Sequence, residues 1–128
     1  MKITRLDHLV FAVENIDAAA EAWASTLGLK VESTVQPPNT HMELAFIPTG
    51  DNFLELVRPT TDSHHIAERG EGMFSVALEV DDVDAAVAEL RSKGVEISDP
   101  EAGVLPKTRV ARIPRAAAHG VAVQLIER

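Results

Sequence analysis

The side chains best suited to chemistry lie in two copies of one sequence pattern. The stretch LDHLVFAVENIDAAAEAW near the start is repeated as MFSVALEVDDVDAAVAEL in the second half. A shift of 67 residues (75 − 8) places Ser75 on His8, and a shift of 69 (124 − 55) places Gln124 on Glu55. An imidazole and a carboxylate can transfer protons or bind a metal ion, whereas a hydroxyl and an amide mainly form hydrogen bonds. The first copy therefore carries the more reactive pair.

Each copy predicts a strand, a helix and three further strands. The apolar runs LDHLVFAV and FSVALEV are typical of strands, and an amphipathic segment follows each of them. Asn15 and Asp82 can cap these helices, which we expect to end at Gly28 and Gly94. The remaining strands are expected at residues 29–34, 41–48 and 53–59 in the first half, and at 95–99, 108–114 and 121–127 in the second.

The duplication predicts the fold. Four strands and one helix cannot bury both faces of their sheet alone, but two such units can share a core around a pseudo-twofold axis. We expect an α+β fold of tandem β-α-β-β-β repeats that form a curled mixed sheet around a cleft, with the helices outside. The 128 residues are expected to form one domain, with repeat one at about 1–60, a connector at about 61–71 and repeat two at about 72–128.

Alternation along the last strand of each copy predicts which side chains face the cleft. Leu54 and Leu56 should pack on one face of the sheet, so that Glu55 lies on the other. The same alternation in the second copy turns Gln124 toward the cleft, between side chains that pack against a helix. His8 and Ser75 occupy matching places on the opening strands of the two copies.

The composition and net charge disfavour several classes of binding partner. The net charge of −8 and a pI of about 5.0 disfavour nucleic acids and anionic membranes, and 4% aromatic residues without tyrosine disfavour a base-stacking surface. No cysteine is present, so disulfides and thiolate chemistry are excluded. We expect a cytoplasmic protein, because no signal-peptide pattern or membrane-length apolar run is found.

The repeated stretches, together with FLELVRP and PRAAAHGVAVQLIE, resemble the vicinal oxygen chelate superfamily. This group includes glyoxalase I, methylmalonyl-CoA epimerase, extradiol dioxygenases and bleomycin-resistance proteins. The likeness is greatest to the epimerase branch and extends over nearly the whole chain. A fold that hosts many reactions predicts the architecture more firmly than the chemistry.

The resemblance implies a divalent metal held by positions 8, 55, 75 and 124, where the usual residues are His, Glu or Gln, His and Glu. This chain keeps His8 and Glu55, while the amide oxygen of Gln124 is a weaker ligand and the hydroxyl of Ser75 a poor one. Two alternatives follow. Either His8, Glu55 and Gln124 hold a metal ion together with water, or the site has no cofactor and these side chains bond to one another.

The resemblance also implies proton abstraction next to a carbonyl, with a carboxylate at the final ligand position as the base. Gln124 stands at that position and cannot take a proton. Glu55 is the first alternative base, and Glu43 on the preceding strand is the second. An unpaired buried carboxyl would be protonated at neutral pH, so Glu55 is expected to have polar partners.

Other residues are candidates for substrate binding. Ser75 and Gln124 are expected to line the cleft, and His41 precedes a strand that could reach the cleft mouth. In the epimerase branch the last turn lies near the substrate entrance, which implies roles for His119 and Arg115, the latter toward a phosphate or carboxylate.

Two functions follow from these observations. The first is an isomerase or lyase of the epimerase or glyoxalase type, acting on a small acyl thioester or 2-oxo compound. The second is a metal-free protein that binds or sequesters a small molecule, as the bleomycin-resistance proteins do. Family precedent also implies a homodimer.

Overall fold

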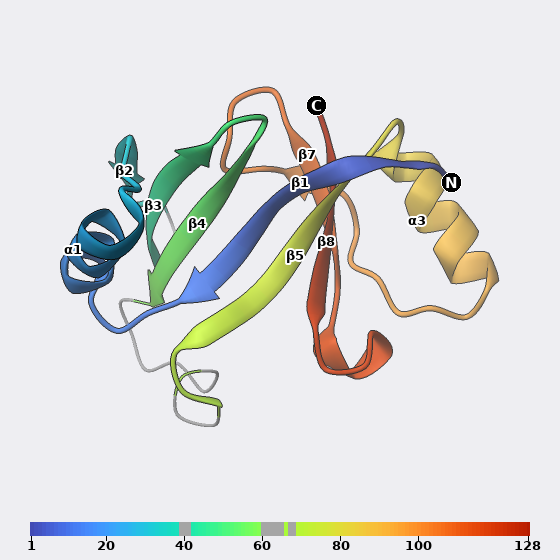
Figure 1. Cartoon of the computed structure of the whole chain (residues 1–128). Helices are drawn as coiled ribbons and strands as arrows, with labels where there is room; N and C mark the ends of the chain where they lie inside the picture. Colours follow the sequence, from blue (N-terminus) through green and yellow to red (C-terminus); the bar gives the residue numbers. More distant parts are fainter. Residues whose placement is uncertain (39–41, 60–65, 67–68) are drawn as a thin grey trace. The chain divides into compact units, whose positions relative to one another are not determined.

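The order of the elements repeats in the two halves of the chain. The computed structural model describes residues 1–38, 42–59, 66 and 69–128. Its elements are β1 (Ile3–Ala12), α1 (Ile16–Leu27), β2 (Ser33–Val35), β3 (Met42–Thr49), β4 (Asn52–Pro59), β5 (Gly72–Val80), α3 (Val83–Ser92), β6 (Glu101–Ala102), β7 (Arg109–Ile113), the 3-10 turn η1 (Arg115–Ala117) and β8 (Ala122–Glu127) (Figure 1). Both halves follow the predicted order of strand, helix and three strands.

The strands form one mixed sheet in the order β2-β3-β4-β1-β5-β8-β7-β6. Strand β5 runs parallel to β8, whereas the pairs β2–β3, β3–β4, β6–β7 and β7–β8 are antiparallel. The α+β fold class predicted from the duplication is thus confirmed. By its contacts the chain divides into unit 1, Met1–His8 with Ser75–Arg128, and unit 2, Leu9–Phe74.

The core of unit 2 lies between α1 and one face of its strands. Asn15 caps the helix by accepting a hydrogen bond from the Ala18 amide at 2.9 Å, and Gly28 ends it with a φ of 71°. The buried core residues come from the β1–α1 connection, the helix, β3 and β4, and they are Val13, Ile16, Ala45, Ile47 and Leu56. Leu54 packs beside Leu56, so the predicted helix-facing pair is confirmed.

The core of unit 1 is built in the same way. Asp82 caps α3 through its carboxylate, which accepts from the Ala85 amide at 3.0 Å, and Gly94 follows the helix with a φ of 79°. Leu125 of β8 is buried against this helix and Val123 packs beside it, as the alternation predicted. Neither helix has the length and apolar character to cross a membrane, and no other described helix has them either.

The segment after α3 differs from the prediction. A strand was expected at residues 95–99, but the only nearby strand is the two-residue β6. The prediction was wrong although Ile97 packs in the helix-facing core with an exposed fraction of 6%. The Arg112 amide of β7 bonds to the hydroxyl of Ser98, where a strand ladder would use a backbone carbonyl. Ser98 still anchors the segment, since its amide donates to the Arg112 carbonyl at 2.9 Å and its hydroxyl accepts from the Arg112 amide at 2.8 Å.

Candidate functional site

Three of the four predicted site residues belong to unit 1, and the fourth belongs to unit 2. His8 lies on β1, Ser75 begins the part of β5 that belongs to unit 1, and Gln124 lies near the middle of β8. Glu55 lies on β4 in unit 2. The geometry of the candidate site is therefore described separately in each unit.

Asp7 and His8 form a buried pair on β1. Their exposed fractions are 0% and 3%, and Nδ1 of His8 lies 2.7 Å from Oδ2 of Asp7. An ionised carboxylate only accepts hydrogen bonds, so Nδ1 must carry the hydrogen and donate it. In the neutral ring, Nε2 is then the nitrogen that accepts a proton or a hydrogen bond.

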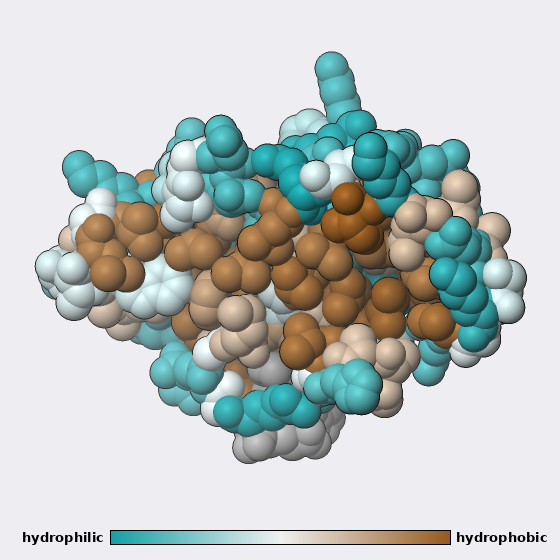
Figure 2. Space-filling model, turned by 45° about the vertical axis from the view of Figure 1, so that its right-hand side comes forward, coloured by the Kyte–Doolittle hydropathy of each residue, from teal (hydrophilic) through white to brown (hydrophobic). Residues whose placement is uncertain are grey.

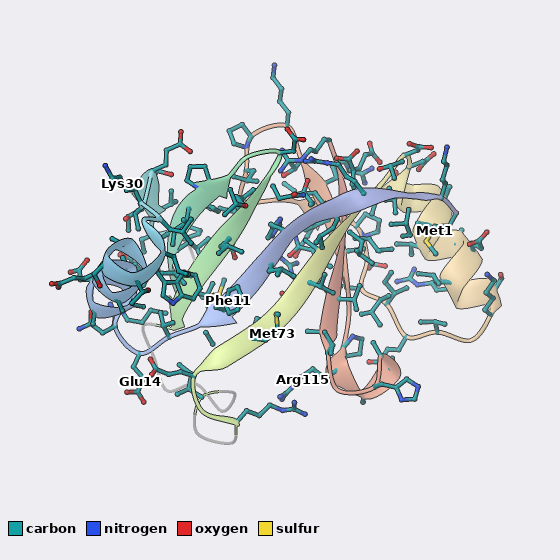
Figure 3. All side chains as sticks on the ribbon, viewed as in Figure 1. Met1, Phe11, Glu14, Lys30, Met73 and Arg115 are labelled. Carbon is teal, nitrogen blue, oxygen red and sulfur yellow. The ribbon has the colours of Figure 1, made fainter. Side chains whose placement is uncertain are left out.

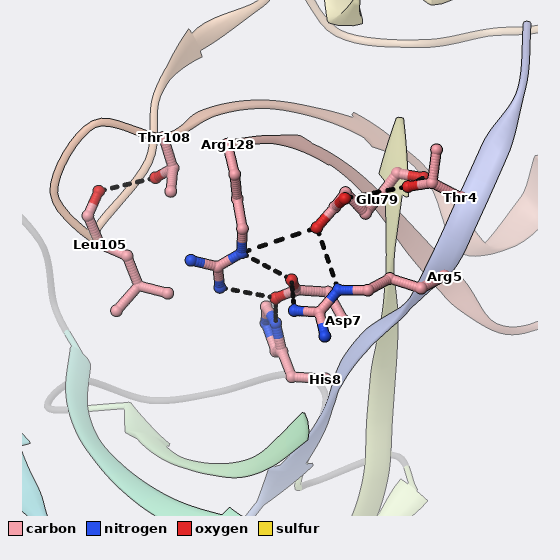
Figure 4. A network of polar contacts seen from close by, with 8 residues as sticks. All are labelled: Thr4, Arg5, Asp7, His8, Glu79, Leu105, Thr108 and Arg128. Atoms are coloured by element: carbon pink, nitrogen blue, oxygen red, sulfur yellow. Dashed lines mark hydrogen bonds and ion pairs between the residues drawn. The ribbon is translucent and has the colours of Figure 1, made fainter. Parts of the chain in front are cut away.

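Two arginines of unit 1, Arg128 after β8 and Arg5 on β1, donate hydrogen bonds to the carboxylate of Asp7 (Figure 4). Arg128 donates from Nε to Oδ1 at 2.7 Å and from Nη2 to Oδ2 at 2.9 Å. Arg5 donates from Nη2 to Oδ1 at 3.0 Å and from Nε to Glu79 at 3.0 Å. Thr4 donates to the other oxygen of Glu79 at 3.0 Å. The buried charge is thus compensated by a connected network of ion pairs and hydrogen bonds.

The network keeps Asp7 ionised and His8 neutral at neutral pH. Burial alone would raise the pKa of Asp7, but the hydrogen bonds from Arg128 and His8 and the charge of Arg128 lower it to about 2. For His8, burial lowers the pKa and the charge of Arg128 lowers it further, against the opposing effect of Asp7. The pair therefore presents an oriented, uncharged imidazole.

The sequence interpretation did not include Asp7, Arg128, Arg5 or Glu79. A signal was present, because Asp7 is a charged residue inside an apolar strand, and a buried carboxylate needs cationic partners. Arg128 could not be found in that way, since 121 residues separate it from Asp7.

Ser75 and Gln124 share the face of the unit 1 strands opposite α3. Val76 and Leu78 of β5 lie on strand positions that alternate with Ser75, and Leu78 packs in the helix-facing core. Gln124 lies opposite Ala77 in β5 and opposite Arg112 in β7. Ser75 has an exposed fraction of 6%.

A small cluster of buried apolar side chains lies on the same face of the strands as these two polar side chains. It consists of Ala77, Val110 and Ile126, which form a separate buried cluster on the same face. The hydroxyl of Ser75 and the amide of Gln124 thus lie on the same face as a buried apolar cluster whose members are at most 1% exposed.

In unit 2, Glu55 and Glu43 lie on opposite faces of the strands. Glu55 is opposite Phe46 in the β3–β4 register, and these positions alternate with the core residues Ala45 and Leu56. Glu55 is partly buried. It therefore lies on the face away from α1, which agrees with the alternation predicted for it.

Glu43 lies on the helix-bearing face of unit 2. It is opposite Arg58 in the register, and its carboxylate accepts from the Arg58 guanidinium at 2.9 Å. A cross-strand ion pair of this kind is a structural contact at the edge of the helix-facing core. The structure thus does not bring Glu43 together with Glu55 on one face.

The turn between β7 and β8 carries the other candidates in unit 1. Arg115 begins η1 and is partly buried, and Figure 3 shows it at this turn. His119 is exposed and has a φ of 54°, a left-handed conformation that fits its place in the turn. His41 lies outside the described residues, as does most of the connector predicted at 61–71.

The side chains of unit 1 do not fit a tightly held divalent metal. Its three family positions supply an imidazole, a hydroxyl and an amide, all of them neutral, and the nearby carboxylate of Asp7 is already engaged by two arginines. Within the described part of the chain, no three His, Asp or Glu side chains form a group that could hold a metal ion.

Unit 2 also has a surface pocket at the start of α1. Its volume is about 530 Å³, and its lining includes Phe11, Trp23, Glu14 and Glu71. The rings of Phe11 and Trp23 meet edge to face with centroids 5.2 Å apart, and the Glu14 amide donates to Glu71 at 2.8 Å. Figure 3 labels Phe11 and Glu14 near this end of β1. None of the predicted site residues lines this pocket.

The sequence matches a known protein family and is similar to several epimerases. Residues 7–111 match the family described as the Glyoxalase/Bleomycin resistance protein/Dioxygenase superfamily. An ethylmalonyl-CoA/methylmalonyl-CoA epimerase from Cereibacter sphaeroides is 30% identical over 100 residues, which cover 74% of this chain and 75% of that protein. The mitochondrial methylmalonyl-CoA epimerase of Mus musculus is 29% identical over 80% of this chain. That match spans only 61% of the mouse protein.

Solved structures agree with this comparison. A variant of Streptomyces coelicolor methylmalonyl-CoA epimerase, in complex with 2-nitronate-propionyl-CoA, superposes with a TM-score of 0.87. It is 31% identical, and the match covers 98% of this chain and 95% of that one. The methylmalonyl-CoA epimerase of Mycobacterium tuberculosis gives the same TM-score at 28% identity, with 98% and 88% covered.

Proposed function

This chain belongs to the Glyoxalase/Bleomycin resistance protein/Dioxygenase superfamily, and we propose that it is an acyl-CoA epimerase. Its reaction would invert the carbon next to the thioester carbonyl of a small acyl group. The observation that carries the proposal is the similarity to epimerases along nearly the whole chain, at 31% identity and a TM-score of 0.87. Of the two reaction classes expected from the sequence, isomerase and lyase, these relatives favour the isomerase.

Inversion at this carbon needs three chemical contributions. A base removes the proton, polar groups stabilise the oxygen of the enolate that forms, and a proton returns on the opposite face. Because Gln124 cannot take a proton, the proton transfers proposed below use other side chains of this protein.

Glu55 is the proposed carboxylate base. It lies on the face of the unit 2 strands that α1 leaves uncovered, whereas Glu43 is paired with Arg58 on the helix-bearing face. The proposed second proton-transfer group is His8, because its neutral ring is oriented by Asp7 and can accept a proton at Nε2.

Hydrogen-bond donors of unit 1 would bind the substrate oxygens. The hydroxyl of Ser75 and the amide of Gln124 share a face and can donate to a thioester or enolate oxygen. Arg115 and His119, in the turn before β8, would contact the phosphates or the free carboxylate of an acyl-CoA. His41 is proposed for the same role.

Proton exchange tests the proposal directly. Protein purified without a metal-affinity tag is incubated in D₂O with methylmalonyl-CoA or ethylmalonyl-CoA, with and without added cobalt, nickel, manganese or zinc. Deuterium is expected at the carbon next to the thioester, and Glu55→Gln should reduce the exchange by about 100-fold or more. Glu43→Gln distinguishes the two carboxylates, and Glu21→Gln on the exposed side of α1 is the matched control. The proposal fails if no substrate exchanges under any of these conditions.

A second candidate function is binding without catalysis. The neutral donor set of His8, Ser75 and Gln124 favours it, since it can form hydrogen bonds to a ligand without activating a metal ion. Calorimetry would then show stoichiometric binding of an acyl-CoA or another small molecule, with no deuterium exchange in the bound ligand. Exchange that Glu55→Gln abolishes would reject this candidate.

We also propose a homodimer. Large apolar side chains are exposed on β1 in unit 1, where Ile3 and Leu6 have exposed fractions of 43% and 42%. Figure 2, turned by 45° from the view of Figure 1, shows hydrophobic residues gathered over the middle of the visible face. Light scattering during size-exclusion chromatography should give twice the chain mass of 13.8 kDa, and Leu6→Glu should shift the protein toward the monomer.

A further inference from the structure

Arg128 connects the strands of unit 1 that carry candidate site residues. It follows β8, the strand of Gln124, and its guanidinium reaches Asp7 on β1, beside His8. Its Nε also lies 4.0 Å from Glu79 on β5, the strand of Ser75. Since β5 stands between β1 and β8 in the sheet order, this one side chain spans three neighbouring strands (Figure 4).

The geometry of this contact determines where the His8 ring can donate. Nε and Nη2 of Arg128 bind the two oxygens of Asp7 separately, at 2.7 and 2.9 Å, which fixes the plane of the carboxylate. Oδ2 accepts from both Nη2 of Arg128 and Nδ1 of His8. The arginine thus fixes the oxygen that orients the imidazole.

Arg5 makes a weaker contact with the same carboxylate. Its Nη2 donates to Oδ1 at 3.0 Å, and its Nε is directed to Glu79. Without Arg128, Oδ2 would lose the hydrogen bond from Nη2, and the carboxylate could rotate about its bond to the chain. An ammonium group at position 128 could replace the charge, but it could not form both hydrogen bonds in one plane.

We propose that Arg128 is a positioning residue that acts through Asp7 to hold His8 in the Nδ1–H tautomer and in one ring orientation. The inference rests on the proposed function for its catalytic consequence. The tautomer itself is a property of the folded protein, which can be measured without any substrate. Partners of this kind, behind a functional histidine, typically affect activity by about 10- to 100-fold.

Nitrogen NMR of the imidazole rings tests the proposal. In ¹⁵N-labelled protein at neutral pH, with His8 assigned by comparison with His8→Gln, Nδ1 should resonate as a protonated nitrogen and Nε2 as an unprotonated one. Arg128→Ala should move both signals toward the average of a mixed tautomer population, and Arg128→Lys should restore part of the difference. Arg109→Ala is the matched control, because its exposed ion pair with Asp84 lies outside this network.

Deuterium exchange provides the second measurement. For Arg128→Ala we expect kcat to fall about 10- to 100-fold with a smaller change in KM, and Arg128→Lys should recover part of kcat. If Arg128→Ala does not fold, Arg128→Lys decides the question by both measurements. Unchanged His8 signals in the folded variant would overturn the proposal. If the wild type shows no exchange, the proposed function fails, whereas the NMR result still decides the role of Arg128.

Discussion

Asp7 shows how a single residue depends on partners far away in the sequence. A carboxylate with no exposed surface would be costly to bury alone, yet this one has its pKa lowered to about 2. The reason is that the hydrogen bonds from Arg128 and His8, with the charge of Arg128, outweigh the effect of burial on this pKa. The same contacts that compensate the charge also determine the state of the neighbouring imidazole.

Asp7→Asn should change the acid dependence of stability. The pKa of Asp7 is lowered from 3.8 to about 2, so its ionisation stabilises the folded protein above about pH 4 and this stabilisation is lost as the pH falls toward 2. The shift corresponds to about 2 kcal/mol. We expect Asp7→Asn to lower the free energy of unfolding by at least this amount at pH 7, and the difference from wild type should shrink below pH 4.

Urea unfolding at a series of pH values measures this effect. Asp99→Asn is the control, because that side chain is 87% exposed and its ion pair with Arg91 is at the surface. The control should have nearly the wild-type stability at every pH. A constant difference between Asp7→Asn and wild type from pH 7 to pH 2 would contradict the prediction.

At the scale of the elements, helices α1 and α3 begin at equivalent N-caps. Asn15 and Asp82 each accept a hydrogen bond from the amide three residues later, at 2.9 and 3.0 Å. Each helix presents an apolar side to the strands of its own unit. The duplication is thus preserved in the caps, although it is lost between His8 and Ser75.

Removal of either cap should destabilise the protein by a similar amount. Asn15→Ala and Asp82→Ala each leave helix amides without their acceptor, which typically costs about 1 kcal/mol. Equilibrium unfolding measures the loss, and hydrogen exchange of the first-turn amides locates it. Glu21→Ala, at an exposed position of α1, is the control and should be nearly neutral. Equal stability of the cap variants and the control would show that the caps contribute nothing.

The β6–β7 connection makes a second prediction at this scale. A Cβ atom at Gly103 would clash with the side chain of Thr108, whose hydroxyl donates to the Leu105 carbonyl at 2.7 Å. Gly103→Ala should therefore lower the free energy of unfolding by about 1–3 kcal/mol. In a double-mutant cycle with Thr108→Ala the loss should be less than additive, because the second change removes the clashing oxygen. Strict additivity would argue against this explanation.

At the scale of the whole molecule, both the composition and the family membership argue against nucleic acid as a partner. A net charge of −8 and few aromatic residues are unfavourable for nucleic acid binding, and the relatives are enzymes that act on acyl-CoA by name. The metal-binding chemistry that the resemblance implies is weakened here, because Ser75 and Gln124 stand where the usual residues are His and Glu. This difference determines the expected response of the protein to chelators.

Metal removal should leave the fold unchanged. The core clusters are apolar, and the buried charge of Asp7 is compensated by arginines, so we expect the melting temperature to stay within about 1 °C after dialysis against EDTA. Elemental analysis of untagged protein should find less than one metal ion for each chain. A stoichiometric metal, with a melting temperature that falls on chelation, would contradict both expectations.

The sequence predicted much of the fold because the repeat, the helix caps and the alternation of apolar residues are local patterns. The helix caps, the β-α-β-β-β order of elements along each repeat and the shared face of Leu54 and Leu56 were found in this way. The strand expected at 95–99 was not formed, since the Ser98 hydroxyl accepts from the Arg112 amide, where a strand ladder would use a backbone carbonyl. The convergence of Glu55 with the residues of unit 1 stays a prediction.

The candidate site was only partly accessible from the sequence. Residue types alone showed that Ser75 and Gln124 are poor replacements for the usual ligands, and alternation gave the face of Gln124. The role of Asp7 could not be read in that way, because its meaning depends on which cations surround it. Equally, only the strand register showed that Glu43 pairs with Arg58 on the face opposite Glu55.

The sequence by itself thus determined the duplicated architecture, the family and the depleted set of metal ligands, since each depends on neighbouring residues or on residue types. Tertiary structure alone decided the charge state and the orientation of the Asp7–His8 pair. The physical reason is that a buried carboxylate is stabilised by donors brought to it through folding, and the donor with two bonds, Arg128, comes from the opposite end of the sequence.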